Sequence, residues 1–141
     1  MTTPSLLQPG AHIDPGVAYL PAEPANVLWG HLPCADDTPV LTVDPGRPVV
    51  VDTSATRGSL RTRAATLGRF GVPPDRVLTD AIAVAASALP REPDEDGPHV
   101  VTGPIAVRGA KPGDVLAIRV QELRRRAPYG LVSSRHGRGA A

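Results

Sequence analysis

Short β-branched runs separated by proline-glycine turns dominate the chain. Residues 39–43 and 48–53 are apolar segments on either side of Asp44-Pro45-Gly46-Arg47. Proline fits the first central position of a tight turn and glycine permits positive φ there, so this stretch predicts strand, turn, strand. Strands are predicted again over residues 100–107.

A second proline-glycine turn, Lys111-Pro112-Gly113-Asp114, precedes an alternating segment. There Leu116, Ile118 and Val120 alternate with Ala117, Arg119 and Gln121. Alternation with a period of two is typical of a strand with one buried face, and we predict such a strand after the turn.

Two helices are predicted between these strand regions. The weaker pattern is Leu60, Ala64 and Leu67; the stronger one follows Asp75 and predicts a helix over residues 75–88, with Asp75 capping its first turn. Its apolar positions recur at helical spacing: Val77, Leu78, Ala81, Ile82 and Ala85.

The first 25 residues contain five prolines, at positions 4, 9, 15, 21 and 24. Proline prevents a regular helix, so we expect residues 1–25 to form an arm outside the core, with an extended piece at residues 17–20. Residues 26–141 are then the folded domain. The predicted class is mostly β (α+β), a strand-rich sandwich or half of a barrel with one or two short helices.

Composition narrows the possible partners. The formal net charge of +1 lacks the basic footprint of a nucleic-acid-binding protein. No apolar run approaches the length of a membrane span, and the N-terminus lacks the pattern of a secretory signal, so we expect a cytoplasmic protein. The single cysteine, Cys34, excludes an intramolecular disulfide.

Several stretches together resemble the acetamidase/formamidase family. The longest are GPHVVTGPI (residues 97–105) and GAKPGDVL (residues 109–116). Upstream, Trp29-Gly30 and PVLTVDPG (residues 39–46) are similar to the family in order and approximate spacing, as are PYG (residues 128–130) and RHGRGA (residues 135–140) downstream. The resemblance covers less than half of a full member, so the second half of the family fold is expected to be missing.

The resemblance implies a mostly-β amidohydrolase that cleaves the C–N bond of small linear amides such as formamide or acetamide, releasing ammonia and a carboxylate. It also implies a homo-oligomer that can carry a divalent metal, zinc or calcium. This reaction needs an activated nucleophile, a proton shuttle and a group that holds the developing oxyanion.

His99 lies within the longest resembling stretch and is the leading candidate for a catalytic residue or metal ligand, with Asp52 or Asp114 as its carboxylate partner. We therefore predict catalytic His99 and Asp52, and metal-ligating His99, Asp52 and Asp114. A structural histidine bonded to the backbone is an equal alternative for His99. Asp114 follows Pro-Gly, where an aspartate commonly binds backbone N–H groups of a turn.

The remaining histidines and Cys34 have weaker claims. Cys34 as an amidase nucleophile needs an adjacent base, and a small buried or loop thiol is the alternative. His12 and His31 lie in proline-rich loops, and His136 either faces a site or frays with the terminus.

Two departures from the family pattern indicate decay toward a degenerate, non-catalytic family member. Relatives carry a His-Glu pair where this chain has Thr56-Arg57, and the next segment, residues 61–66, is shorter and less acidic. The loss of this pair removes a candidate acid/base or metal-ligand pair. The alternatives to an amidase are a truncated, non-catalytic binding or oligomerisation module, and a fragment of a longer gene product.

Overall fold

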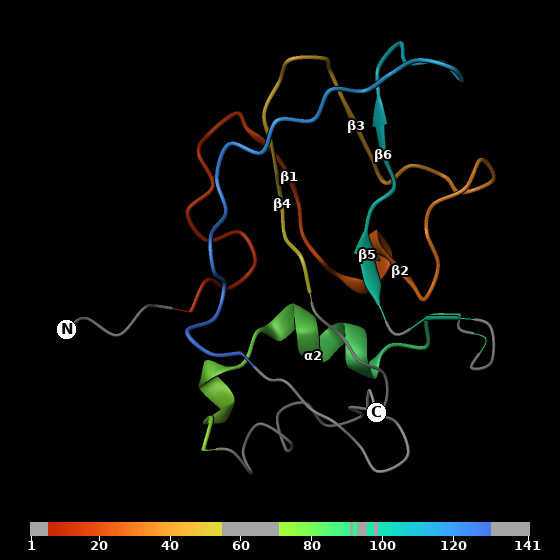
Figure 1. The fold of residues 1–141 in the computed structure, drawn as a ribbon. Helices are drawn as coiled ribbons and strands as arrows, with labels where there is room; N and C mark the ends of the chain where they lie inside the picture. Colours follow the sequence, from red (N-terminus) through yellow and green to blue (C-terminus); the bar gives the residue numbers. More distant parts are fainter. Residues whose placement is uncertain (1–5, 55–70, 91, 93–95, 98, 131–141) are drawn as a thin grey trace, which may run out of the picture.

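The computed structural model describes residues 6–54, 71–90, 92, 96–97 and 99–130. Six short strands and one α-helix lie in this part, so the predicted mostly-β, α+β class is confirmed (Figure 1). In chain order the elements are β1 (Ala18–Leu20), η1 (Pro24–Asn26), β2 (Val27–Trp29), β3 (Leu41–Val43), β4 (Val49–Val51), η2 (Pro74–Arg76), α2 (Thr79–Ala86), β5 (Val100–Thr102) and β6 (Ile105–Val107).

The six strands form three two-stranded sheets, and no barrel closes among the described residues. β1 pairs with β4 in parallel, with Tyr19 opposite Val50. β2 pairs with β5 antiparallel, with Trp29 opposite Val100, and β3 pairs with β6 in parallel. Each pair joins strands far apart in sequence, so the fold depends on long-range contacts.

The predicted strand, turn and strand of residues 39–53 are confirmed. Arg47 N–H donates to Asp44 C=O at 3.2 Å, and Gly46 takes the positive φ of 75° that the turn requires. The two strands do not pair with each other, because β1 and β6 take their backbone hydrogen bonds. Both strands predicted over residues 100–107 are present as β5 and β6, joined by a cis Gly103–Pro104 bond.

The helix predicted over residues 75–88 is present but shorter. It begins at Thr79 and is preceded by the 3₁₀ turn η2, which contains Asp75. The predicted Asp75 cap is wrong, because neither η2 nor α2 has a side-chain cap from its own N-cap residue. The weaker helix pattern, at Leu60, Ala64 and Leu67, lies outside the described residues.

Gln8 satisfies the start of α2 from 71 residues away. Its Oε1 accepts hydrogen bonds from Thr79 N–H at 3.0 Å and from Thr79 Oγ1 at 3.1 Å. Its Nε2 donates to Val77 C=O at 3.1 Å. The first backbone N–H groups of a helix lack hydrogen-bond partners within the helix. Here the Gln8 side chain, distant in sequence, accepts from one of them in place of a local N-cap residue.

The core is small and aliphatic, as expected from a chain with one Trp, one Phe and two Tyr. Ala22, Val27 and Val84 are buried together, and partly buried Trp29, Leu89 and Val100 pack against them. Leu20 and Ala22 are buried, so the expectation of an arm outside the core is wrong for residues 18–22. Leu20 ends β1, which pairs with β4, and Ala22 two residues later packs in the core cluster with Val27 and Val84.

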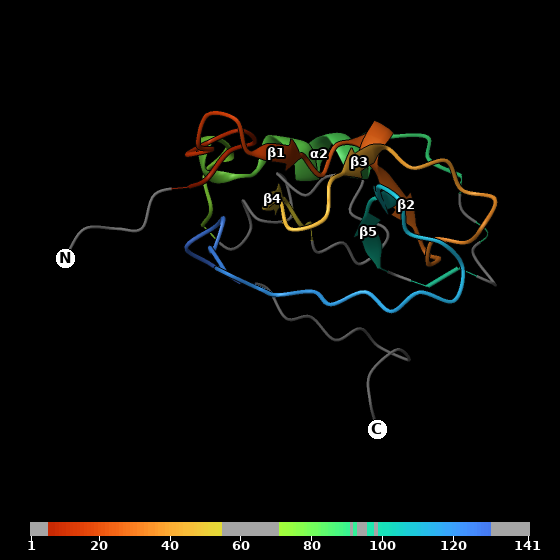
Figure 2. The same cartoon turned by 90° about the horizontal axis from the view of Figure 1, so that it is seen from above.

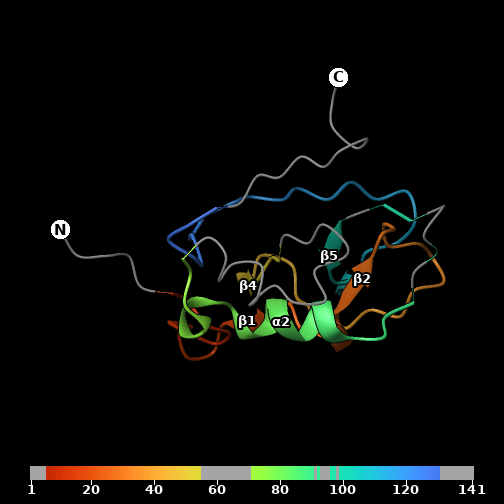
Figure 3. The ribbon, with the colours of Figure 1, turned by 90° about the horizontal axis from the view of Figure 1, so that it is seen from below.

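The strand predicted after the second turn is not formed. Val115, Ile118 and Leu123 are 95%, 88% and 89% exposed, and no strand of the described part pairs with this segment. Apolar and polar residues do alternate in this segment, but a β-strand forms only where a neighbouring strand pairs with its backbone N–H and C=O groups. Figures 2 and 3 show residues 115–123, in blue, running along one side of the body apart from the labelled strands.

No helix among the described residues is both long and apolar enough to cross a bilayer. The cytoplasmic location stays a prediction.

Candidate functional site

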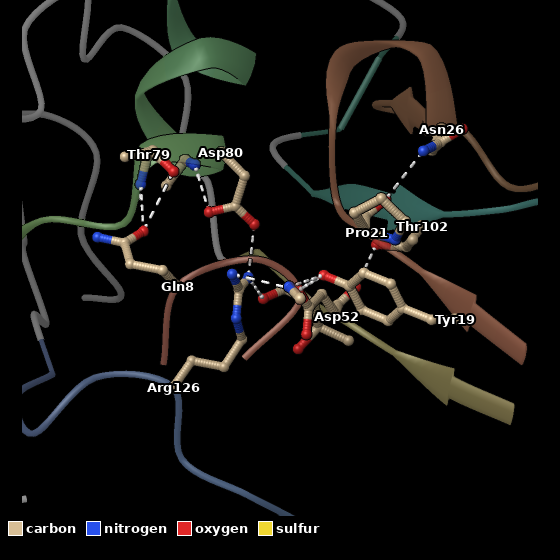
Figure 4. Close-up of polar contacts among 12 residues, drawn as sticks. Gln8, Tyr19, Pro21, Asn26, Asp52, Thr79, Asp80, Thr102 and Arg126 are labelled. Carbon is tan, nitrogen blue, oxygen red and sulfur yellow. Dashed lines mark hydrogen bonds and ion pairs between the residues drawn. The ribbon is translucent and has the colours of Figure 1, made fainter. Parts of the chain in front are cut away.

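Asp52, a predicted catalytic residue, lies directly after β4 and faces β1. Tyr19 Oη donates a hydrogen bond to Asp52 Oδ2 at 2.6 Å (Figure 4). Two backbone contacts fix its position: Asp52 N–H donates to Leu20 C=O at 3.0 Å, and Thr102 Oγ1 donates to Asp52 C=O at 2.7 Å. Asp52 thus lies between the β1–β4 ladder and the end of β5.

Arg126 joins this carboxylate to a second one on α2. Its Nη2 lies 3.3 Å from Asp52 Oδ2, and its Nη1 donates to Asp80 Oδ2 at 2.6 Å (Figure 4). The side chains of Arg126, Asp52 and Asp80 are 11%, 13% and 1% exposed. We call Tyr19, Asp52, Asp80 and Arg126 the charge cluster.

Each member of the charge cluster comes from a different part of the chain. Tyr19 is on β1, Asp52 follows β4 and Asp80 is in the first turn of α2, where a carboxylate also favours the positive end of the helix dipole. Leu7 N–H donates to Arg126 C=O at 2.8 Å, which holds the backbone that delivers the guanidinium.

Burial and the neighbouring carboxylate raise the pKa of the Tyr19 phenol to about 12. Loss of its proton would leave a phenolate, poorly solvated, beside Asp52. Gly10 N–H donates to Tyr19 Oη at 2.7 Å, which opposes the rise without cancelling it. Tyr19 therefore acts as a hydrogen-bond donor to Asp52 over the whole neutral range.

The cluster leaves polar atoms unsatisfied. Arg126 Nε and Nη2 are buried without a hydrogen bond, although Nη2 keeps its ion-pair contact with Asp52. Ser54 Oγ, close in sequence to Asp52, is likewise buried without one. Two aspartates and one arginine share this site, so the charges are only partly balanced.

His99 is separate from the charge cluster. It precedes β5, its C=O accepts a hydrogen bond from Gly30 N–H at 2.8 Å, and its exposed ring makes no hydrogen bond within the described part. Thr102, which contacts Asp52, is three residues further along the chain. Among the described residues, no hydrogen bond or ion pair joins His99 to Asp52.

Asp114 is a turn residue, as its position after Pro-Gly suggested. Its Oδ2 accepts from Lys111 N–H at 2.8 Å, and its own N–H donates to Lys111 C=O at 3.0 Å. This is the alternative that the sequence favoured for Asp114.

The described residues do not fit the divalent metal that the resemblance implies. Nowhere among them do three or more His, Cys, Asp or Glu side chains converge to hold an ion, so His99, Asp52 and Asp114 do not form a shared site. Asp52 already has a cationic partner in Arg126 and a hydrogen-bond donor in Tyr19. Both contacts are made at Asp52 Oδ2.

The weaker candidates lie in loops. Cys34 is exposed, and its N–H donates to Asp37 Oδ2 at 2.8 Å, which matches the loop-thiol alternative. His31 Nδ1 is 3.9 Å from Asp96 Oδ1, and His12 contributes only its C=O, to Arg124. His136 and the Thr56-Arg57 position lie outside the described residues.

Sequence reasoning missed Asp80 and Arg126. A signal for Asp80 existed: Val77, Ala81 and Val84 are the buried positions of this region, and residue 80 falls on the same helical face. A charged residue on a buried face requires a partner. Nothing distinguishes Arg126 from Arg124 and Arg125 in the sequence, because only the path of the backbone decides which of them is buried.

No family model, curated protein or solved structure matches this chain. The acetamidase/formamidase resemblance thus rests on the motifs alone.

Proposed function

We propose that the chain is an amidohydrolase-like protein that hydrolyses C–N bonds of small linear amides of the formamide and acetamide type. The observation that carries this proposal is the resembling stretch of residues 97–116. Its two strands, β5 and β6, pair with β2 and β3, so the stretch links two of the three sheets. The partner strand β3 lies within a second resembling stretch, residues 39–46.

Within this proposal His99 keeps its expected catalytic role, and Asp52 takes a different one. The exposed imidazole of His99 is the proton shuttle, because an imidazole can both accept and donate a proton. Asp52 is a positioning residue, because its carboxylate is held by Arg126 and Tyr19. Zinc or calcium remains part of the proposal only as an added component, and no step is assigned to it.

Ammonia release from formamide and acetamide by the purified chain, with and without zinc or calcium, tests the proposal. We expect turnover that His99→Ala abolishes. His31→Ala is the matched control, because His31 is also an exposed loop histidine. Equal loss in both variants would contradict the role of His99.

A non-catalytic binding or oligomerisation module is the second candidate. It is favoured by the ion pair between Arg126 and Asp52, which neutralises the carboxylate that an amidase site would need. A folded protein with no ammonia release above buffer, with either metal, would select this candidate.

A further inference from the structure

Residues 115–123 form an open stretch of backbone at the surface. Every residue of this segment is exposed, and Ile118 and Val120, which flank Arg119, are 88% and 68% exposed. Figures 2 and 3 show the segment running along one side of the body, apart from the labelled strands. A large partner can therefore reach the peptide bonds on either side of Arg119.

The backbone of this segment is also unpaired. Within the described part, no N–H or C=O group of residues 115–123 takes part in a hydrogen bond. Endoproteases cut chain that is open, and the cost of opening a folded segment comes from the hydrogen bonds and burial that it must lose. Residues 115–123 have neither to lose, so the folded chain already presents them as a peptide substrate.

Arg119 lies at the middle of the segment. Its side chain is exposed and makes no hydrogen bond or ion pair in the described part of the chain. Trypsin-like serine endoproteases recognise the basic residue before the cleaved bond through a carboxylate in their specificity pocket. The guanidinium of Arg119 can enter such a pocket without breaking a contact of its own.

We propose that residues 115–123 are a processing site, at which an arginine-specific serine endoprotease cleaves the Arg119–Val120 bond of the folded chain. The protease serine attacks the Arg119 carbonyl carbon, the C–N bond breaks, and the Val120 nitrogen takes a proton as it leaves. Water then attacks the acyl-enzyme and releases the Arg119 carboxylate. The step needs no reactant besides the protease and water.

Some other basic residues of the described part lack a bond that such a protease can cut. Arg47 and Lys111 are each followed by proline, whose nitrogen carries no hydrogen, and a bond to proline resists these enzymes. The Arg126 side chain is 11% exposed in the charge cluster. The Arg125–Arg126 bond and the bond after Arg126 therefore do not fit an active site.

The remaining basic residues are held by the body. Arg76 and Arg108 each donate their backbone N–H to a carbonyl group, at 2.9 and 2.8 Å. The Arg124 guanidinium donates to His12 C=O at 3.1 Å. Arg119 is thus the one basic residue of the described part that combines an unpaired backbone, a side chain without contacts and an accessible bond.

The piece that follows the cut stays bound to the body. Arg126 is held in the charge cluster, and its C=O accepts a hydrogen bond from Leu7 N–H at 2.8 Å. Tyr129 Oη donates to Arg76 C=O at 2.8 Å. Cleavage therefore breaks the chain without releasing residues 120–130.

Limited digestion of the folded full chain with trypsin, followed by intact mass spectrometry, tests the proposal. Among the bonds of the described part, we expect the Arg119–Val120 bond to be cut at least about tenfold faster than the bond after Arg76, because only the latter requires local opening. Arg119→Gln should remove this cut. Arg125→Gln is the matched control, since Arg125 is also exposed, and it should leave the rate at Arg119 unchanged.

Gln8→Ala separates cleavage of the folded chain from cleavage of the unfolded chain. The variant removes the contacts of Gln8 at the start of α2, so the cut after Arg76 should become faster, whereas the cut after Arg119 should keep its rate. Size-exclusion chromatography then tests whether the pieces stay together. Residues 120 onward should elute with the body in native buffer and separate from it in urea.

Two results would overturn the proposed site: a cut after Arg119 that is no faster than the cut after Arg76, or equal acceleration of both cuts in Gln8→Ala. The second result would show that cleavage after Arg119 requires unfolding. Separation of the two pieces in native buffer would overturn their retention by the charge cluster.

Discussion

Arg126 Nη1 donates a hydrogen bond to Asp80 Oδ2 at 2.6 Å across 46 residues of the chain. The Asp80 side chain is 1% exposed and the Arg126 side chain 11% exposed, so the Asp80 carboxylate is almost fully removed from water. Because the same guanidinium also lies beside Asp52, the segment that follows residues 115–123 is fastened both to α2 and to the residue after β4. The contacts of the charge cluster therefore indicate a structural role in the described fold more than they indicate a catalytic centre.

Replacement of Arg126 by Met should destabilise the chain strongly. The variant keeps much of the side-chain volume but leaves two buried carboxylates without their cation, a change that costs about 3–5 kcal/mol. Urea unfolding measures the loss. Arg124→Met is the matched control: Arg124 pairs with Glu122 in an exposed contact, and surface pairs contribute at most about 1 kcal/mol. Equal effects of the two changes would contradict the importance of burial.

If Arg126→Met fails to fold, Arg126→Lys keeps the test informative. Lysine retains the positive charge but lacks the planar guanidinium that contacts both carboxylates. We therefore expect a free energy of unfolding between that of the wild type and that of Arg126→Met.

Stability should fall between pH 10 and 12 because of Tyr19. Its pKa is raised from 10.0 to about 12 in the folded chain, so above pH 10 the unfolded chain loses this proton first. The contribution of the raised pKa is complete below pH 10 and is lost as the pH rises to about 12. Urea unfolding across this range measures it, and Tyr19→Phe should remove that part of the pH dependence. An unchanged slope in Tyr19→Phe would show that another group is responsible.

Gln8→Ala should weaken the start of α2. The change removes the acceptor for Thr79 N–H and the donor to Val77 C=O, and loss of a helix cap typically costs about 0.5–2 kcal/mol. Thermal unfolding followed by far-ultraviolet circular dichroism measures the loss. Gln121→Ala is the control, because Gln121 is exposed and makes no hydrogen bond in the described part. A Gln8 variant as stable as this control would contradict the capping role.

Gly30→Ala should cost more than Gly46→Ala. Both glycines have positive φ, 95° and 75°, so both alanines carry backbone strain. Only at Gly30 would the new Cβ collide with another residue, the side chain of Asp96; at Gly46 the space is open. We expect an additional loss of about 1–3 kcal/mol at Gly30, measured as the difference between the two unfolding free energies. Equal losses would show that this loop relaxes freely.

The site was predicted less well than the fold because its chemistry depends on long-range placement. Asp52 and Asp114 were predicted as carboxylate partners of His99, and the place of Asp114 after Pro-Gly indicated a turn residue. His99 was expected beside Asp52, but no hydrogen bond or ion pair joins the two side chains in the described part of the chain. Asp80 and Arg126 are 46 residues apart and come into contact only in the folded chain, so no local sequence pattern predicts this ion pair.

The sequence by itself determined the local elements. β-branched runs gave β3, β4, β5 and β6, and helical spacing gave α2, because these patterns reflect preferences of neighbouring residues. Only the tertiary structure decided which strands pair, which of three consecutive arginines is buried, and that the alternating segment of residues 115–123 has no partner strand within the described chain. Strand pairing and side-chain burial depend on residues that are distant in sequence. An amphipathic strand pattern therefore shows which side chains of a segment can be buried, but whether they are buried depends on the surface that the rest of the fold presents to them.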